Sequence, residues 1–202
     1  MTMKKTLLAV ISEMIAQGID PVSKEQELWE RFGERHAILV LDSTGFTRTT
    51  NQFGIIHFLS RLAQKRNIAI PIIEKHDSEI YITEADSIIA LFPSVQNALD
   101  AILEIHHTIR EKKLMLTDDE AFQVCAGIGY GDLLVTGEYG DFYGPEMNLA
   151  SKLGEDSAEA NELMLTEAAY AELDVSMQEK FIRKESQVSG NSIPYYLKHM
   201  PR

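Results

Sequence analysis

The chain of 202 residues is 45% hydrophobic and 25% charged, an ordinary globular composition with enough apolar residues for one core. Its formal net charge of −12 argues against general nucleic-acid binding, and it disfavours an anionic nucleotide unless metal ions neutralise the phosphates. The single cysteine, Cys125, excludes an internal disulfide and a zinc site built on several cysteines. No run approaches the ~20 apolar residues of a membrane span, so we expect a cytoplasmic protein without one.

Two short helices are expected before the first strand. Residues 4–17 place their apolar side chains on one side of a helix, and residues 23–32 follow with Ser23 as the N-cap. We therefore expect residues 1–35 to be a helical extension that packs on the domain or pairs with a second copy. Residues 36–202 would form the domain itself.

The elements of that domain follow in an order typical of one fold class. Residues 69–76 contain Pro71 and are expected to be an edge or irregular piece. The order β-α-β-β-α-β predicts an α/β (α+β) fold with a ferredoxin-like βαββαβ core and further α/β elements after it. The pattern predicts strands at 36–42, 79–84, 87–92, 121–130, 162–166, 180–184 and 193–198, and helices at 53–65, 94–112, 145–153 and 167–173.

Two aspartates lie beside apolar runs that are typical of buried strands. Asp42 follows the run 37–41, and Asp86 lies between the runs 80–83 and 88–92. Each is compatible with a turn, since aspartate often bonds its own backbone at a strand end. On neighbouring strands the two carboxylates would instead share one divalent ion such as Mg²⁺, which is typically held by one or two carboxylates and substrate phosphates. The second interpretation predicts a nucleotide enzyme.

Four segments in the right order resemble the class III nucleotide cyclases, the family of adenylate and guanylate cyclase catalytic domains. They correspond to the first metal motif, the second metal motif, a glycine-rich strand end, and the substrate loop with its helix. The resemblance runs from about His36 to Lys198. The four segments are residues 41–47, 84–93, 127–132 and 141–153.

The resemblance implies a head-to-tail homodimer with the active site between the two copies. Asp42 and Asp86 of one copy would hold two Mg²⁺ or Mn²⁺ ions, to which Ser43 would offer its backbone carbonyl. Paired ions clamp the triphosphate and activate the ribose 3′-hydroxyl for in-line attack on the α-phosphate. The resemblance further implies substrate binding at Phe46, Thr47 and Ile82, recognition of the base by Asp141, orientation of the ribose by Asn148, and stabilisation of charge at phosphorus by Lys152.

Several of these residues depart from the family pattern. Ser43 stands where an isoleucine is usual. Lys152 replaces an arginine, which keeps the charge and loses the planar fork. Ile82 occupies the position of a base-reading lysine, and an isoleucine cannot hydrogen-bond a purine. Asp141 is equally compatible with an ordinary aspartate in a turn rich in Gly and Tyr.

Three functions fit these residues. The first is a cyclase that converts a nucleoside triphosphate, ATP by default, to its 3′,5′-cyclic monophosphate (cAMP) and pyrophosphate. The second is a catalytically weakened module of the same fold that binds nucleotide or a partner protein in signalling. The third is a cyclase for a base other than adenine. We favour the first, because a site without a catalytic role need not keep both Asp42 and Asp86 together with Asn148.

Overall fold

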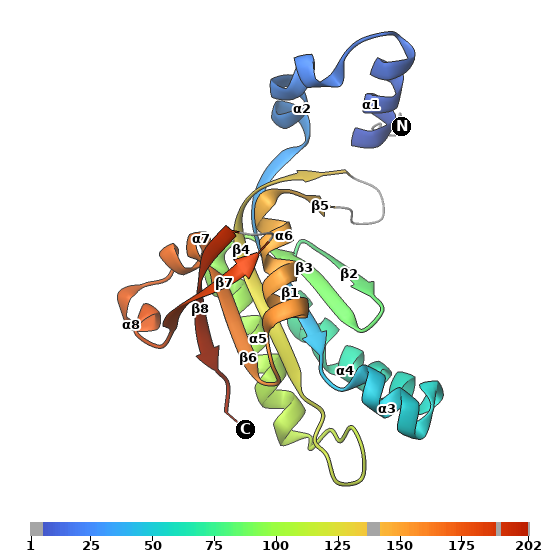
Figure 1. The fold of residues 1–202 in the computed structure, drawn as a ribbon, viewed down its shortest axis with the longest axis vertical. Helices are drawn as coiled ribbons and strands as arrows, with labels where there is room; N and C mark the ends of the chain where they lie inside the picture. Colours follow the sequence, from blue (N-terminus) through green and yellow to red (C-terminus); the bar gives the residue numbers. More distant parts are fainter. Residues whose placement is uncertain (1–5, 137–141, 189–190, 202) are drawn as a thin grey trace.

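The computed structural model of the chain describes residues 6–136, 142–188 and 191–201. An eight-stranded sheet carries helices on both faces, and two helices stand at one end of it (Figure 1). The strands are β1 Gly33–Ser43, β2 Ile80–Glu84, β3 Ser87–Phe92, β4 Val124–Val135, β5 Phe142–Tyr143, β6 Glu162–Thr166, β7 Ile182–Val188 and β8 Asn191–His199. The helices are α1 Leu7–Ala16, η1 Pro21–Lys24, α2 Glu25–Phe32, α3 Phe46–Phe53, α4 Ile55–Lys75, α5 Val95–Glu111, α6 Pro145–Ser151, η2 Lys152–Ser157, α7 Glu167–Ala171 and α8 Val175–Gln178.

The sheet confirms the ferredoxin-like prediction. Its strand order is β2-β3-β1-β4-β6-β8-β7, with β5 paired to β4. The first four strands of the chain thus lie in the order β4-β1-β3-β2 with α4 and α5 as crossovers, which is the arrangement of a βαββαβ core. All pairs are antiparallel except β4 with β6.

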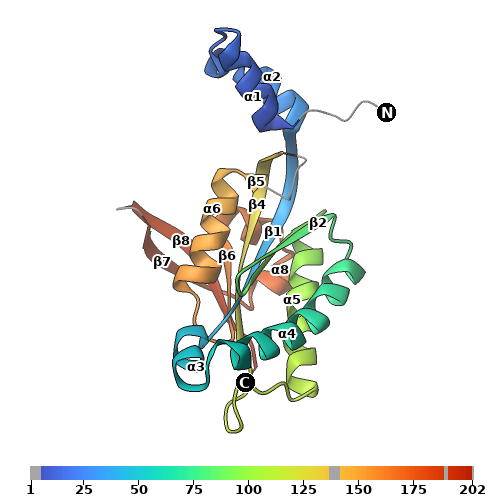
Figure 2. The same cartoon turned by 90° about the vertical axis from the view of Figure 1, so that its right-hand side faces the viewer.

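Alternation along β1 separates the two faces of the sheet. Leu39 and Leu41 belong to the larger core, which α4 and α5 cover, whereas Ile38 and Val40 belong to a smaller cluster on the face of α6. Figure 2 shows α6 on one side of the sheet and α4 and α5 on the other. Every second residue of β1 therefore points to α6.

The expected extended piece at 69–76 is wrong, because α4 runs unbroken from Ile55 to Lys75 with Pro71 inside it. A proline in a helix interior costs about 3 kcal/mol. The same helix buries an apolar stripe, and each such side chain contributes roughly 1.5–3 kcal/mol, so burial outweighs the proline. The stripe consists of Phe58, Leu62, Ile68, Ala69, Ile72 and Ile73.

A short helix that the sequence pattern did not predict, α3, precedes α4, and a glycine lies at each of its ends. The predicted helix at 53–65 is in fact the beginning of α4, and a separate helix, α3, precedes it. Gly45 (φ +90°) stands just before α3, and Gly54 (φ +86°) separates α3 from α4. Both conformations lie in the region that favours glycine. The turn at Gly54 lets α3 and α4 run in different directions (Figure 2).

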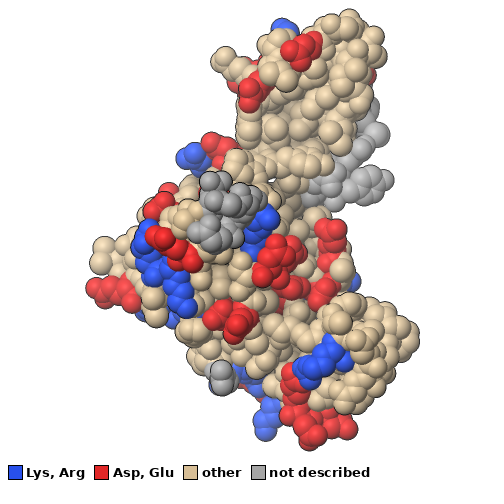
Figure 3. Space-filling view, in the orientation of Figure 1, with Lys and Arg blue, Asp and Glu red and all other residues tan. Residues whose placement is uncertain are grey.

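The N-terminal helices sit on an extension of the β1–β4 ribbon. β4 runs to Val135, beyond the predicted end of this strand at residue 130, and it pairs with β1 as far as Gly33 opposite Leu134. Leu7, Val10 and Leu28 form a cluster of their own, against which Leu134 packs. The second helix begins with η1, capped by the Asp20 carboxylate rather than by Ser23. The face that this pair of helices turns to the viewer in Figure 3 is largely uncharged.

Candidate functional site

The fold brings Asp42 and Asp86 to the same end of the sheet. Asp42 is the penultimate residue of β1, and Asp86 lies in the two-residue turn between β2 and β3. Because Leu41 of β1 lies opposite Ile88 of β3, that turn meets the end of β1. Ser87 Oγ donates a hydrogen bond to Asp42 Oδ1 at 3.1 Å. Burial raises the pKa of Asp42, and the neighbouring charge of Asp86 raises it further.

Beneath this pair lies a buried lysine that the sequence analysis missed. Lys65 of α4 is fully buried, and its Nζ donates to Ser43 Oγ at 2.7 Å and to the backbone oxygen of Asp86 at 2.6 Å. Burial lowers the pKa of Lys65 to about 8, against the attraction of Asp42 and Asp86. A signal was present, since Lys65 stands three residues after Leu62, on the apolar stripe of α4.

A third carboxylate joins the site from η2. Burial raises the pKa of Glu155, and the negative charge of Asp42 raises it further. The hydrogen bond between Glu155 and Ser87 acts in the opposite direction and lowers that pKa. η2 is a π-helix, a rare conformation that often occurs at functional sites. It lies close to the sheet because Gly154 has no side chain: a Cβ there would meet Gly127 N at 2.7 Å and Val40 O at 2.8 Å.

The glycines of β4 allow α6 an equally close approach. A Cβ on Gly127 would meet the Ala150 backbone oxygen at 2.2 Å, and one on Gly129 would meet the Glu146 backbone oxygen at 2.7 Å. These glycines are therefore positions of close backbone contact between β4 and α6. The glycine stripe therefore sets the position of α6, and with it the positions of Asn148 and Lys152.

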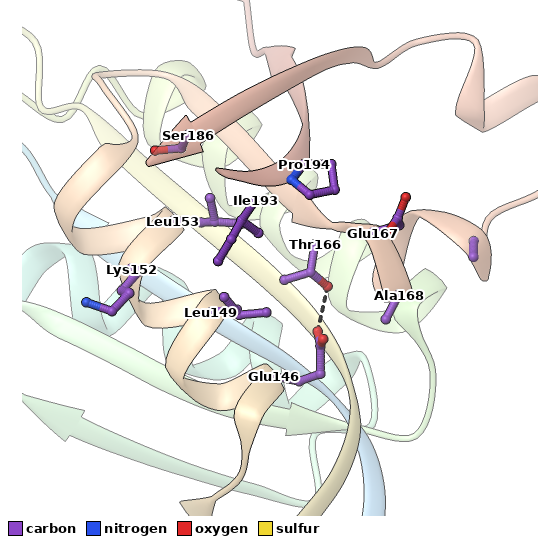
Figure 4. Close-up of a pocket in the computed structure, with 11 residues that line it drawn as sticks. Glu146, Leu149, Lys152, Leu153, Thr166, Glu167, Ala168, Ser186, Ile193 and Pro194 are labelled. Carbon is purple, nitrogen blue, oxygen red and sulfur yellow. Dashed lines mark hydrogen bonds between the residues drawn. The ribbon is translucent and has the colours of Figure 1, made fainter. Parts of the chain in front are cut away.

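Asn148 and Lys152 lie on successive turns, since the Lys152 N–H donates to the Asn148 backbone oxygen. Asn148 is exposed and Lys152 half-buried. Lys152 borders a cavity of about 390 Å³ between α6, α7 and the β7–β8 hairpin, with Leu149 and Ile193 among its apolar walls (Figure 4). Among the described residues, no hydrogen bond or ion pair joins Asn148 or Lys152 to Asp42 or Asp86, so a single copy does not unite the two groups by direct contact.

The other predicted site residues that the structure describes lie on two elements, α3 and β2. Phe46 begins α3 with 41% of its surface exposed, and its ring packs edge-on against Phe58 at 4.8 Å between centroids. Thr47 follows and is exposed. Ile82 lies on β2, half-buried, and packs against the smaller cluster on the α6 face. Asp141 lies outside the described residues.

The donor set around Asp42 fits a hard divalent ion. Asp86 repels Asp42, Asp42 repels Glu155, and both aspartates attract the buried ammonium of Lys65. Clustered carboxylate oxygens are the ligands that Mg²⁺ and Mn²⁺ prefer. A divalent ion would offset the burial and the smaller charge repulsion that raise the pKa values of Asp42 and Glu155.

No protein-family model and no curated protein sequence matches the chain. Solved structures do match it. An adenylate/guanylate cyclase/hydrolase from Silicibacter pomeroyi is 23% identical, with a TM-score of 0.72 over 84% of this chain and 98% of its own. The guanylyl cyclase Cya2 is 17% identical, with a TM-score of 0.68 over 82% of this chain and 90% of its own. The adenylyl cyclase CyaB from P. aeruginosa is 17% identical, with a TM-score of 0.64 over 84% and 97%.

These structures superpose on most of this chain and almost their whole length is covered, which confirms the resemblance at the level of the fold. Within the described ranges, the structure has no helix that combines the length and the apolarity needed to cross a bilayer. The chain has the fold of the class III nucleotide cyclase catalytic domains.

Proposed function

We propose that this protein is a nucleotide cyclase, which forms a 3′,5′-cyclic nucleotide and pyrophosphate from a nucleoside triphosphate, with ATP as the default substrate and cAMP as its product. One observation carries the proposal: on a cyclase fold, Asp42 and Asp86 meet at the end of β1, where burial and mutual repulsion raise the pKa of Asp42. A carboxylate whose charge is disfavoured in this way, with a second carboxylate beside it, is prepared for a cation rather than for turn formation alone.

The roles of the residues follow from their positions. Asp42, Asp86 and the backbone carbonyl of Ser43 would hold two Mg²⁺ or Mn²⁺ ions, which lower the pKa of the 3′-hydroxyl and bind the triphosphate. Phe46 and Thr47 begin α3 beside this centre, where they would border the phosphates. Lys152, half-buried at the cavity edge, would bring a positive charge to the phosphorus. Asn148, exposed on the same helix, would orient the ribose.

Two copies would complete the site. Asn148 and Lys152 have no described contact with the carboxylate pair, so we assign them to the site formed with the carboxylates of a second copy, as in a head-to-tail homodimer. Residues 1–35 would be an appended extension. The structure from Silicibacter pomeroyi covers 84% of this chain, and the part that it does not cover is about as long as residues 1–35. Exposed Leu8, Ile15 and Val22 make that extension a candidate for pairing between copies.

The base is the least constrained part of the substrate. Ile82 offers no hydrogen bond to a purine, and its side chain packs against the apolar cluster on the α6 face. This favours a cyclase with loose selectivity, or one for a base other than adenine, as the second candidate. The third candidate is a module of the same fold that binds nucleotide without turnover.

The test is product formation by the purified protein with Mn²⁺ and each of ATP, GTP, CTP and UTP, resolved by mass spectrometry. Asp42→Asn removes one carboxylate charge and keeps an acceptor for Ser87, and Asp118→Asn, in an exposed loop, is the matched control. A cyclic nucleotide that disappears with Asp42→Asn and persists with Asp118→Asn supports the cyclase and identifies its base. Absence of product from all four triphosphates, with a folded dimer, would overturn it in favour of the binding module.

A further inference from the structure

A second cluster of ligand-type side chains lies at the opposite end of β1. Glu34 and His36 point from β1 to the α6 face, because they alternate in register with Ile38 and Asp42. Glu79, just before β2, completes the group, and its backbone N–H is fixed by a 3.0 Å bond to the Leu91 oxygen. One ligand atom from each of the three residues lies within 4.8 Å of the others. His36 is six residues from Asp42, or about 20 Å along a strand.

His36 carries an unsatisfied nitrogen inside this cluster. Its side chain is only 6% exposed, and its Nε2 lies 2.9 Å from Glu34 Oε2. Its Nδ1 is buried and has no hydrogen-bond partner among the described residues. The Glu79 carboxylate lies 3.8 Å from that nitrogen, too far for a hydrogen bond. A buried polar atom left unsatisfied is costly, so a group that bonds the imidazole and both carboxylates would stabilise the cluster.

The surrounding charges favour a cation as the group that bonds the imidazole and the carboxylates. The basic residue between Glu34 and His36 in the chain, Arg35, is held by the Asp132 carboxylate at 2.8 Å. Glu34 and Glu79 are each about half exposed, with 51% and 49% of their side chains accessible, so both can turn toward an ion. Around a zinc ion at ~2.0–2.2 Å from each ligand, neighbouring ligand atoms lie roughly 3–3.6 Å apart. Binding of such an ion would draw the three ligand atoms, now within 4.8 Å of one another, to that spacing.

We propose that Glu34, His36 and Glu79 form a second metal site, separate from Asp42 and Asp86, that takes a transition-metal ion of the zinc type. One imidazole with two carboxylates suits such an ion better than it suits Mg²⁺, which prefers oxygen ligands alone. The bound ion would link Glu34, which lies just after the end of α2, to Glu79 at the start of β2. It therefore couples the N-terminal helices to the strand that carries Ile82 and leads to Asp86.

Tag-free protein, stripped of metal with a chelator, is titrated with Zn²⁺ in the presence of excess Mg²⁺, and binding is measured by calorimetry. A second titration uses Co²⁺, and binding is measured from the visible absorption of the bound Co²⁺. Four variants are compared: His36→Gln, Glu79→Gln, Asp42→Asn, and His107→Gln at the exposed His107–Glu111 pair as the matched control. We expect one Zn²⁺ per chain, bound normally by Asp42→Asn and His107→Gln and more than about tenfold more weakly by His36→Gln and Glu79→Gln.

The outcomes separate this site from the cyclase centre. If His36→Gln does not fold, Glu79→Gln decides alone, because that side chain is half exposed. Undiminished Zn²⁺ binding by Glu79→Gln would overturn the proposal, as would loss of binding in Asp42→Asn or in the His107→Gln control. Absence of any Zn²⁺ binding by the unmodified protein would overturn it as well. None of these readouts depends on nucleotide turnover, so failure of the cyclase proposal would leave the result interpretable.

Discussion

Lys65 gives the clearest quantitative prediction, because its buried charge titrates in an accessible range. Its pKa is 10.5 in an unfolded chain and about 8 in the folded protein, with burial as the main cause. The lowered value means that the unfolded chain binds more protons between these two pH values, so the metal-free protein gains stability as pH rises through that window. At 1.36 kcal/mol per pKa unit, the full gain is roughly 3 kcal/mol.

Lys65→Met removes this titration and keeps an unbranched side chain of similar length. Between pH 7 and pH 10 we expect the free energy of unfolding of the unmodified protein to rise by roughly 2–3 kcal/mol relative to the variant. The measurement is urea unfolding, followed by far-UV circular dichroism with a chelator present, at both pH values. Groups that Lys65 does not influence titrate alike in both proteins and cancel from the difference.

Lys112→Met, at an exposed lysine after α5, is the matched control, and its difference from the unmodified protein should not change with pH. A pH-independent difference for Lys65→Met would refute the reasoning, because it would mean that Lys65 titrates alike in the folded and unfolded states.

Four further predictions follow from the same geometry. Asp42→Asn should stabilise the metal-free protein at pH 7, because a raised carboxyl pKa means that folding opposes the charge, and Mn²⁺ should raise the thermal midpoint of the unmodified protein only. Ser43→Ile should cost roughly 1–3 kcal/mol in urea unfolding, and much less in a Lys65→Met background. Gly127→Ala should cost roughly 1–3 kcal/mol, because its Cβ would meet backbone atoms. Lys152→Arg should raise kcat in the cyclase assay, since a guanidinium can bind two phosphate oxygens.

The core order could be predicted because each of its elements carries its own pattern. β1, β3 and α5 are buried runs or amphipathic stripes, and the structure places them where the sequence did. The error in α4 has the opposite origin. Proline does disfavour the interior of an isolated helix. In α4 this effect is outweighed, because the apolar stripe on both sides of Pro71 packs on the sheet.

The site residues likewise fall into those that a local sequence pattern reveals and those that only tertiary contacts reveal. Asp42 and Asp86 could be found because strand ends and a turn mark them locally. Glu155 could not, because it reaches Asp42 only through a π-helix that glycines at 127 and 154 hold against the sheet. No local pattern states that a glutamate 113 residues after Asp42 will share its environment.

Ser43 shows how a departure from a family pattern becomes intelligible once tertiary contacts are known. An isoleucine at 43 would face the larger core, beside α4, and would suit an apolar neighbour there. In this chain the neighbour is Lys65, whose ammonium needs acceptors because it has no access to water. The serine hydroxyl supplies one and the Asp86 backbone oxygen another. Serine at 43 and lysine at 65 are therefore a matched pair, which joins the end of β1 to the turn that carries Asp86 and so fixes the spacing of the two carboxylates.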